Sequence, residues 1–166
     1  MALGRPYIAP IHISASFSAA IDIFELGAAS GKPLMLMGFE FGQTTEVGDA
    51  QEEQMALVLK RCTGSFTSGS GGGTSTFRPQ QPNDAAAGAT LETGNTTKAA
   101  TGSGTIVDML RLPWNVRASC LYVPIPEDRI VLDASTSLVL ELLSTPADSI
   151  GGTNGVIGWI SIEELV

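Results

Sequence analysis

Apolar and polar residues alternate along several short stretches of this chain, which is the period expected of a β-strand with one buried face. The clearest stretch is IHISASFS, residues 11–18, where apolar residues hold the odd positions and polar residues the even ones. LMLMGFEFG, residues 34–42, is mostly apolar and also alternates, which would place its two leucines on the face opposite Phe39 and Phe41. We therefore predict a strand over each stretch.

Further strands are expected along the rest of the chain. EQMALVLKRC has a helix-like composition, but its alternation and the Gly/Ser run that ends it favour a strand. Other short apolar segments are each bounded by Pro, Gly, Asn, Asp or Ser, namely AIDIFEL, VRASCLYVPIP, DRIVLD, SLVLELLS and GVIGWISIEEL. Short strands separated by such turn residues are typical of all-β sandwiches. The pattern predicts an all-β fold.

One segment, residues 63–104, has a different texture. Its 42 residues include nine glycines and only three large apolar side chains, Phe66, Phe77 and Leu91. A segment so poor in apolar mass cannot form a core alone, and an ordered connection this long is usually functional. A flexible linker between two domains is the alternative. We favour an ordered Gly/Thr/Pro-rich excursion from a single domain that spans residues 1–166.

The glycines do not form a nucleotide-binding loop. Such a loop follows a strand, precedes a helix and carries glycines at fixed positions, so that backbone N–H groups converge on a phosphate. In SGSGGGTST no amphipathic helix follows, and Pro79 and Pro82 come next. GAASGKP, residues 27–33, is one residue too short for a P-loop and ends in proline where serine or threonine would hold magnesium. We interpret both as glycines in turns.

Catalytic and metal-binding patterns are also missing from the sequence. His12 is the single histidine, Cys62 and Cys120 are far apart without a C-x-x-C pair, and no G-x-S-x-G motif occurs. We expect no enzymatic activity and no cofactor. The cysteines would pair only if the fold brought them together, and two buried free thiols are the favoured interpretation.

An acidic cluster in EVGDAQEE leaves one alternative open. It contains Glu46, Asp49, Glu52 and Glu53, which could bind calcium or act as an acid/base pair. The spacing matches no known ligand loop, and a solvated turn before a strand is the favoured interpretation.

Composition limits the partners. Charged residues make up only 16% of the chain against 43% hydrophobic ones, which fits a surface partly covered by neighbouring subunits. The net charge of −8 and the lack of a basic stripe argue against nucleic-acid binding. No apolar run is long enough to span a membrane. The N-terminal MALGRPYIAPIHIS lacks the features of a signal peptide, so we expect synthesis and assembly in a cytoplasm.

Three pieces of the sequence carry a resemblance to a known family. They are GQTTEVGDAQEEQ, the glycine run with its proline-rich sequel, and PEDRIVL. Together with the order of the segments between about Ile11 and Leu165, they resemble small virion proteins of tailed bacteriophages that are similar to jelly-roll cement or decoration proteins of the capsid. The resemblance implies an eight-stranded antiparallel jelly-roll sandwich, commonly trimeric, that binds the outside of the major capsid protein lattice.

Two classes of function remain open at this stage. The first is a structural protein on the capsid exterior that cements the major capsid protein. The second is a binding module of a phage particle, such as a head-fibre base or a receptor- or glycan-binding knob. Such a knob would expose aromatic residues in a concave patch, yet only 6% of the chain is aromatic.

The excursion is the predicted subunit interface. Glycines from Cys62 to Thr76 would let the backbone approach a neighbouring subunit closely, as the start of an arm ordered largely by contacts between subunits. Phe66 and Phe77 would bracket this run as apolar anchors, with Trp114 as a third candidate. Core burial of Trp114 and a floppy surface loop are the alternatives. A closed homotrimer is the expected assembly.

Overall fold

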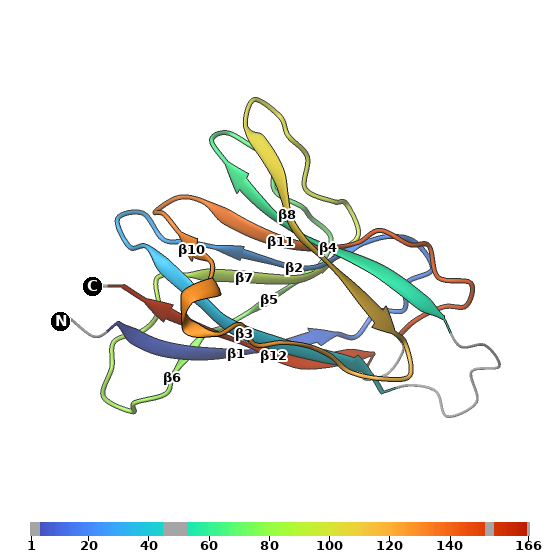
Figure 1. Cartoon of the computed structure of the whole chain (residues 1–166), viewed down its shortest axis with the longest axis horizontal. Helices are drawn as coiled ribbons and strands as arrows, with labels where there is room; N and C mark the ends of the chain where they lie inside the picture. The colour runs from blue at the N-terminus through green and yellow to red at the C-terminus, as the bar shows by residue number, and fades with distance from the viewer. Residues whose placement is uncertain (1–3, 45–52, 152–154, 166) are drawn as a thin grey trace.

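The computed structural model describes residues 4–44, 53–151 and 155–165 and consists of two antiparallel β-sheets packed face to face (Figure 1). Sheet A contains β1, β3, β6, β9, β10 and β12. Sheet B contains β2, β4, β5, β7, β8 and β11. The only helix among the described residues is the 3-10 turn η1, Pro126–Asp128. The predicted all-β fold is confirmed.

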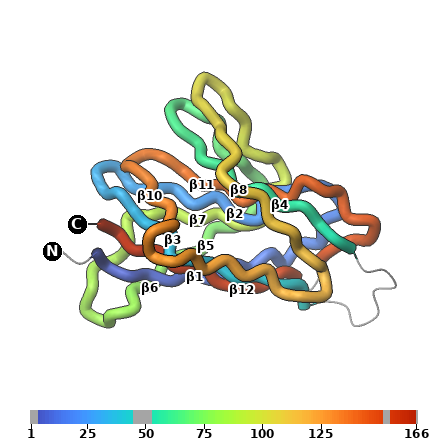
Figure 2. Tube along the Cα trace, in the orientation of Figure 1, coloured from blue at the N-terminus to red at the C-terminus, as the bar shows by residue number. Residues whose placement is uncertain are grey.

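The strands follow one another along the chain with these bounds: β1 Arg5–Ile13, β2 Asp22–Gly27, β3 Leu34–Gln43, β4 Gln54–Thr63, β5 Gly73–Ser75, β6 Arg78–Pro79, β7 Thr90–Asn95, β8 Thr105–Asn115, β9 Cys120–Tyr122, β10 Val131–Leu132, β11 Ser137–Leu142 and β12 Val156–Glu164. The tube in Figure 2 shows β1 and β12, near the two ends of the chain, side by side in sheet A.

The order of the strands is that of a jelly roll. Sheet A runs β10-β3-β12-β1-β6, with β9 also paired to β3, and sheet B runs β5-β7-β2-β11-β4-β8. Successive strands cross between the sheets, so that β1, β3 and β12 lie in sheet A while β2, β4 and β11 lie in sheet B. If β9 and β10 are counted as one strand interrupted by η1, eight main strands form two four-stranded sheets, which is the jelly-roll pattern.

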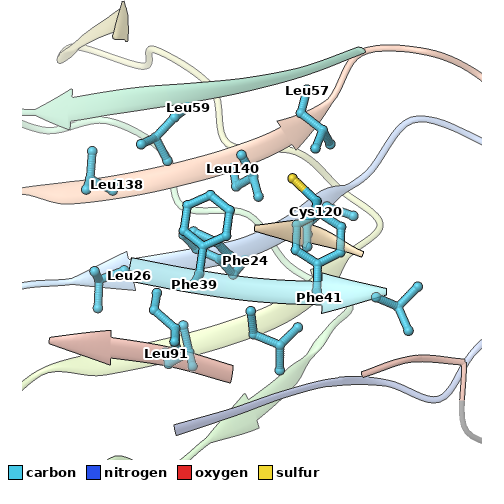
Figure 3. Packing of buried hydrophobic residues seen from close by; sticks show 14 of the residues in the cluster. Phe24, Leu26, Phe39, Phe41, Leu57, Leu59, Leu91, Cys120, Leu138 and Leu140 are labelled. Atoms are coloured by element: carbon cyan, nitrogen blue, oxygen red, sulfur yellow. The ribbon is translucent and has the colours of Figure 1, made fainter. Parts of the chain in front are cut away.

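The inner faces of the two sheets enclose one apolar core (Figure 3). Phe24 of sheet B meets Phe39 of sheet A edge to face, with ring centroids 5.3 Å apart. Trp114 of sheet B meets Phe41 of sheet A in the same geometry at 5.1 Å. Such pairs add about 0.5–1.5 kcal/mol each to the stability that burial provides. These aromatic contacts hold the sheets together across the core.

A bulge in β3 corrects one expectation from the sequence. The two leucines of this strand were expected opposite Phe39 and Phe41, but all four side chains are fully buried. The pairing of β3 with β12 shifts register between Gly38 and Leu36, which leaves Met37 unpaired. One extra residue reverses the alternation beyond it. Both halves of the strand therefore face the core.

The first strand also differs from its expected bounds. It begins at Arg5, before the alternating stretch, and ends at Ile13. Ala15 is exposed, whereas Phe17 is buried and forms an isolated bridge with Ile150. The alternating residues after Ile13 thus form a loop, which contacts the core again through Phe17.

The excursion is built into the sandwich. Its strands β5 and β7 extend sheet B beyond β2, and β6 pairs with β1 in sheet A. Two further parts, residues 63–73 and 95–104, form a flap of two arms joined by bridges between Thr67 and Ala100 and between Ser70 and Thr97. Figure 1 shows this flap on the side of sheet B that faces away from sheet A. The segment is thus ordered by contacts within one chain.

Two of the three predicted interface residues lie in the core of their own chain. Phe77 is 4% exposed and Trp114 is 1% exposed, and the indole Nε1 of Trp114 donates to the carbonyl of Ala118. Phe77, expected as an anchor against a neighbouring subunit, is thus packed in the core of its own chain, and for Trp114 the alternative of core burial is the one that the structure shows. Phe66, in the flap, is only partly buried. An interface role stays a prediction for Phe66.

Leu91 gives a test of whether residues 63–104 belong to the folding unit. It lies in β7 and is fully buried in the core. We expect Leu91→Ala to lower the free energy of unfolding by about 2–5 kcal/mol, because truncation leaves a cavity. Denaturant titration measures this change. Leu121→Ala, at a side chain 60% exposed, is the matched control and should cost far less. Equal small losses for both variants would contradict the account.

Candidate functional site

The outer face of sheet A is apolar and uncovered over much of its extent. Because side chains alternate across a sheet, the neighbours of the buried Phe39, Phe41 and Ile160 point outward. The strand register aligns Leu121, Glu40, Trp159 and Pro10 in one row. The adjacent rows contribute the exposed Ile8 and Ile157, and a row further along contributes the exposed Val131.

A hollow of about 660 Å³ lies at one end of this face. Trp159, Ile157 and Pro10 line its apolar side, and residues 117–119 line another. Gly42 lies between Ile157 and Ser119, and a Cβ atom built there would lie 3.5 Å from Ser119. The hollow therefore exists in part because Gly42 has no side chain.

Polar groups surround the apolar floor of the hollow. The indole Nε1 of Trp159 donates to Oε2 of Glu40 at 3.2 Å, which fixes the indole against the sheet. His12, Gln43 and Arg117 also line the hollow. An apolar floor with a polar and charged rim is the usual anatomy of a protein-binding surface.

The outer face of sheet B, in contrast, is covered by the flap. Val58, Cys62 and Val139 are buried there although they lie outside the main core cluster. Glu25 of β2 accepts hydrogen bonds from the Ser68 hydroxyl and the Gly69 amide of the flap. The two sheets thus differ in what covers them: the flap covers sheet B, whereas none of the described residues covers the apolar face of sheet A in the same way.

The edge of sheet B is protected against strand addition. The edge strand β8 is eleven residues long and exposes Val107 and Met109. Its pairing with β4 shifts register between Leu110 and Asp108, and Pro113 offers no N–H group. Bulges, prolines and charges all discourage the pairing of another strand with an edge. The apolar face of sheet A is therefore the better candidate for a binding surface.

The acidic cluster expected from the sequence is only partly described. Glu46, Asp49 and Glu52 lie outside the described residues, so the question of an ion there stays open. The carboxylate of Glu53 accepts hydrogen bonds from the amides of Ala147 and Asp148. Glu53 thus fastens the chain before β4 to the loop after β11. Among the described residues, no three His, Cys, Asp or Glu side chains are grouped to hold a metal ion.

The two cysteines are buried free thiols, as expected from the sequence. Burial raises the pKa of Cys62 to about 12, with a further contribution from Glu25 and Asp22, and raises the pKa of Cys120 to about 11. Both thiols are therefore protonated at neutral pH and are poor nucleophiles. His12, the single histidine, is exposed on β1. The carboxylate that accepts a hydrogen bond from the indole of Trp159 is Glu40.

Comparisons with protein-family models, curated proteins and solved structures found no match for this chain. Within the described residues, no helix is long and apolar enough to cross a membrane.

One feature of the sequence indicates this apolar outer face. In GVIGWISIEEL the apolar residues occupy both alternating sets, with Ile157 and Trp159 on one side and Val156 and Ile160 on the other. A strand that is apolar on both faces is typical of sheets covered on both sides. Here one face is covered by the core and the other is open.

Tryptophan fluorescence checks this geometry. Trp159 is partly exposed beside the hollow, whereas Trp114 is buried. We expect a dissolved quencher such as iodide to quench the emission of Trp159 and to leave the emission of Trp114. Trp159→Phe should remove the quenchable fraction while the fold, followed by circular dichroism, is retained. Emission from Trp159→Phe that remained as quenchable as that of the wild type would contradict this placement.

Proposed function

We propose that this protein is a structural virion protein, a capsid cement or decoration protein that binds the outer surface of the major capsid protein lattice through the outer face of sheet A. The observation that carries the proposal is the open apolar face, with its hollow, on a sandwich whose other sheet is covered by its own flap. The resemblance of the sequence to capsid decoration proteins supplies the identity of the partner.

The mechanism is physical and needs no cofactor. A rigid sheet that buries apolar surface against two adjacent capsid subunits adds to the free energy required to separate them. A stable contact needs about 1,200–2,000 Å² of total buried surface, so the proposal requires contact across β9, β3, β12 and β1 together. Many copies would then hold the shell together against internal pressure. The proposed location is the capsid exterior, after assembly in the host cytoplasm.

Substitutions on the face test the docking surface. Ile157 is 45% exposed on sheet A, and Val107 is 52% exposed on the edge strand of sheet B. We expect Ile157→Asp to weaken binding to purified capsids about 30-fold or more, because it places a charge in the apolar centre of the contact. Co-sedimentation with capsids over a concentration series measures the affinity.

Val107→Asp is the matched control for this experiment and should bind capsids like the wild type. Gly42→Ala adds a smaller test, because the added methyl group meets Ser119 at ordinary contact distance and makes the hollow shallower. Equal affinities for wild type, Ile157→Asp and Gly42→Ala would refute docking through this face.

A homotrimer is proposed on the same resemblance. Phe66 is the predicted interface residue that keeps exposed surface, and it lies in the flap. We expect Phe66→Asp to convert a trimer into a monomer, because a charge in the contact would be desolvated without a partner. Light scattering measures the mass. A wild-type protein that is monomeric at high concentration would remove the trimer from the proposal.

The second candidate function is a receptor- or glycan-binding module of a phage particle. The observation in its favour is the hollow beside Trp159, since a partly exposed indole can pack against the apolar face of a sugar ring. Binding to immobilised glycans that is lost in Trp159→Ala, without binding to capsids, would favour this function over cementing.

A further inference from the structure

The contact between the flap and sheet B is unusually rich in buried charge. Asp22 and Glu25 of β2 and Glu141 of β11 are all buried beneath the flap. Lys60 of β4 and Lys98 of the flap both bind Glu141, Lys98 at 3.0 Å. The flap is thus fastened to the sheet through ionisable groups.

The negative and positive charges of this cluster do not balance. Glu92 of β7 stands directly opposite Glu25 across the strand pair, so four carboxyl groups meet two ammonium groups. Both ammonium groups are engaged with Glu141, while Glu25 receives two hydrogen bonds from the flap. Glu92 accepts one from the side-chain amide of Asn95. Among the described residues, no cation is bonded to Asp22.

Asp22 is the least satisfied member of the cluster. Its side chain is fully buried, its Oδ2 accepts one hydrogen bond from the Ala99 amide of the flap at 2.7 Å, and its Oδ1 has no partner. A buried carboxylate with one hydrogen bond and no cation is costly, and its protonated form is much less so. The geometry thus points to a proton-binding site at the junction of the flap and the sheet.

We propose that protonation of Asp22 controls the closure of the flap, which is held shut at acidic pH and loosens as the pH rises to neutrality. When Asp22 is neutral, the Ala99 arm packs on a cluster whose charges are closer to balance. When Asp22 ionises, a desolvated negative charge lies beside Glu141 and Glu25. This charge favours the open state of the flap, because opening lets water solvate the carboxylate.

The electrostatics of the cluster support this direction. Burial, then the nearby Glu141 and Glu25, raise the pKa of Asp22 from 3.8 to about 7, against the lowering effects of the Ala99 amide and Lys60. A carboxyl group whose pKa is raised in the closed state stabilises that state fully below its ordinary pKa, and the stability is lost as the pH rises through about 7. Burial raises the pKa of Glu141, but the hydrogen bonds and charges of Lys60 and Lys98 together outweigh it and lower that pKa, so Glu141 is protonated only at more acidic pH.

Cys62 provides a probe of flap closure. It lies on the outer face of β4, is fully buried and is close enough to Asp22 and Glu25 for both to affect its pKa. In a Cys120→Ala background its thiol is the single one in the chain. The rate of its reaction with dithiodipyridine, divided by the rate in denaturant at the same pH, gives the protection provided by the flap.

In the parent variant, which carries Cys120→Ala alone, we expect the protection of the Cys62 thiol to fall by up to about tenfold per pH unit from pH 5 to 7. The protection should level off above pH 7. In Asp22→Asn, protection should be independent of pH and higher than in the parent at pH 8. In Asp133→Asn, the control at an exposed aspartate outside the cluster, the pH dependence should persist.

A second readout needs no cysteine substitution. Exchange of the Ala99 amide, corrected for its intrinsic rate at each pH, should accelerate from pH 5 to 7 in the wild type, while exchange of amides in the central strand β11 stays slower. Protection that is constant from pH 5 to 8 in the wild type would overturn the proposal. Persistence of the pH dependence in Asp22→Asn, or equal opening of β11 and the flap, would also overturn it.

Discussion

A β-sheet has two faces, and the need to cover apolar side chains on both of them shapes this protein. The inner faces of the two sheets cover each other, with Phe24 against Phe39 and Trp114 against Phe41. The outer face of sheet B is covered by the chain's own flap. The outer face of sheet A has no such cover within the described chain, and its exposed side chains include Ile157 and Leu121.

The two outer faces are built from different chemistry. The flap meets sheet B through carboxylates, lysines and backbone amides, including the bonds from Ser68 and Gly69 to Glu25. Polar contacts of this kind have a small net stability and depend on pH. Sheet A offers aliphatic side chains and one indole, whose burial against a partner would be driven by the hydrophobic effect. The proposed adjustable cover on one side and the proposed docking face on the other both rest on this difference.

The fold class could be predicted from the sequence because alternation and turn residues are local signals. β3, β4, β11 and β12 were expected close to where they lie. β8 was missed because its bulge near Met109 and its Pro113 interrupt the alternation of TIVDMLRLPWN. The reversed alternation in β3 was missed for the same reason, since a bulge depends on the partner strand.

The roles of single residues were harder to predict. Phe77 and Leu91 belong to a segment whose composition is too poor in apolar residues to form a core, yet both enter the core formed by the rest of the chain. The apolar outer face of sheet A was not predicted, because alternation shows that a strand has two faces but does not show which one the described chain leaves uncovered. The proton-binding cluster joins residues from β2, β4, β7, β11 and the flap, and no local pattern could have brought them together.

The central claim is that the outer face of sheet A is where a partner docks, and hydroxyl-radical footprinting on capsids tests it most directly. We expect the side chains of Ile8, Leu121 and Trp159 to lose reactivity when the protein binds purified capsids, while Val107 and Met109 of β8 keep theirs. Protection of β8 with an unchanged outer face of sheet A would contradict the account.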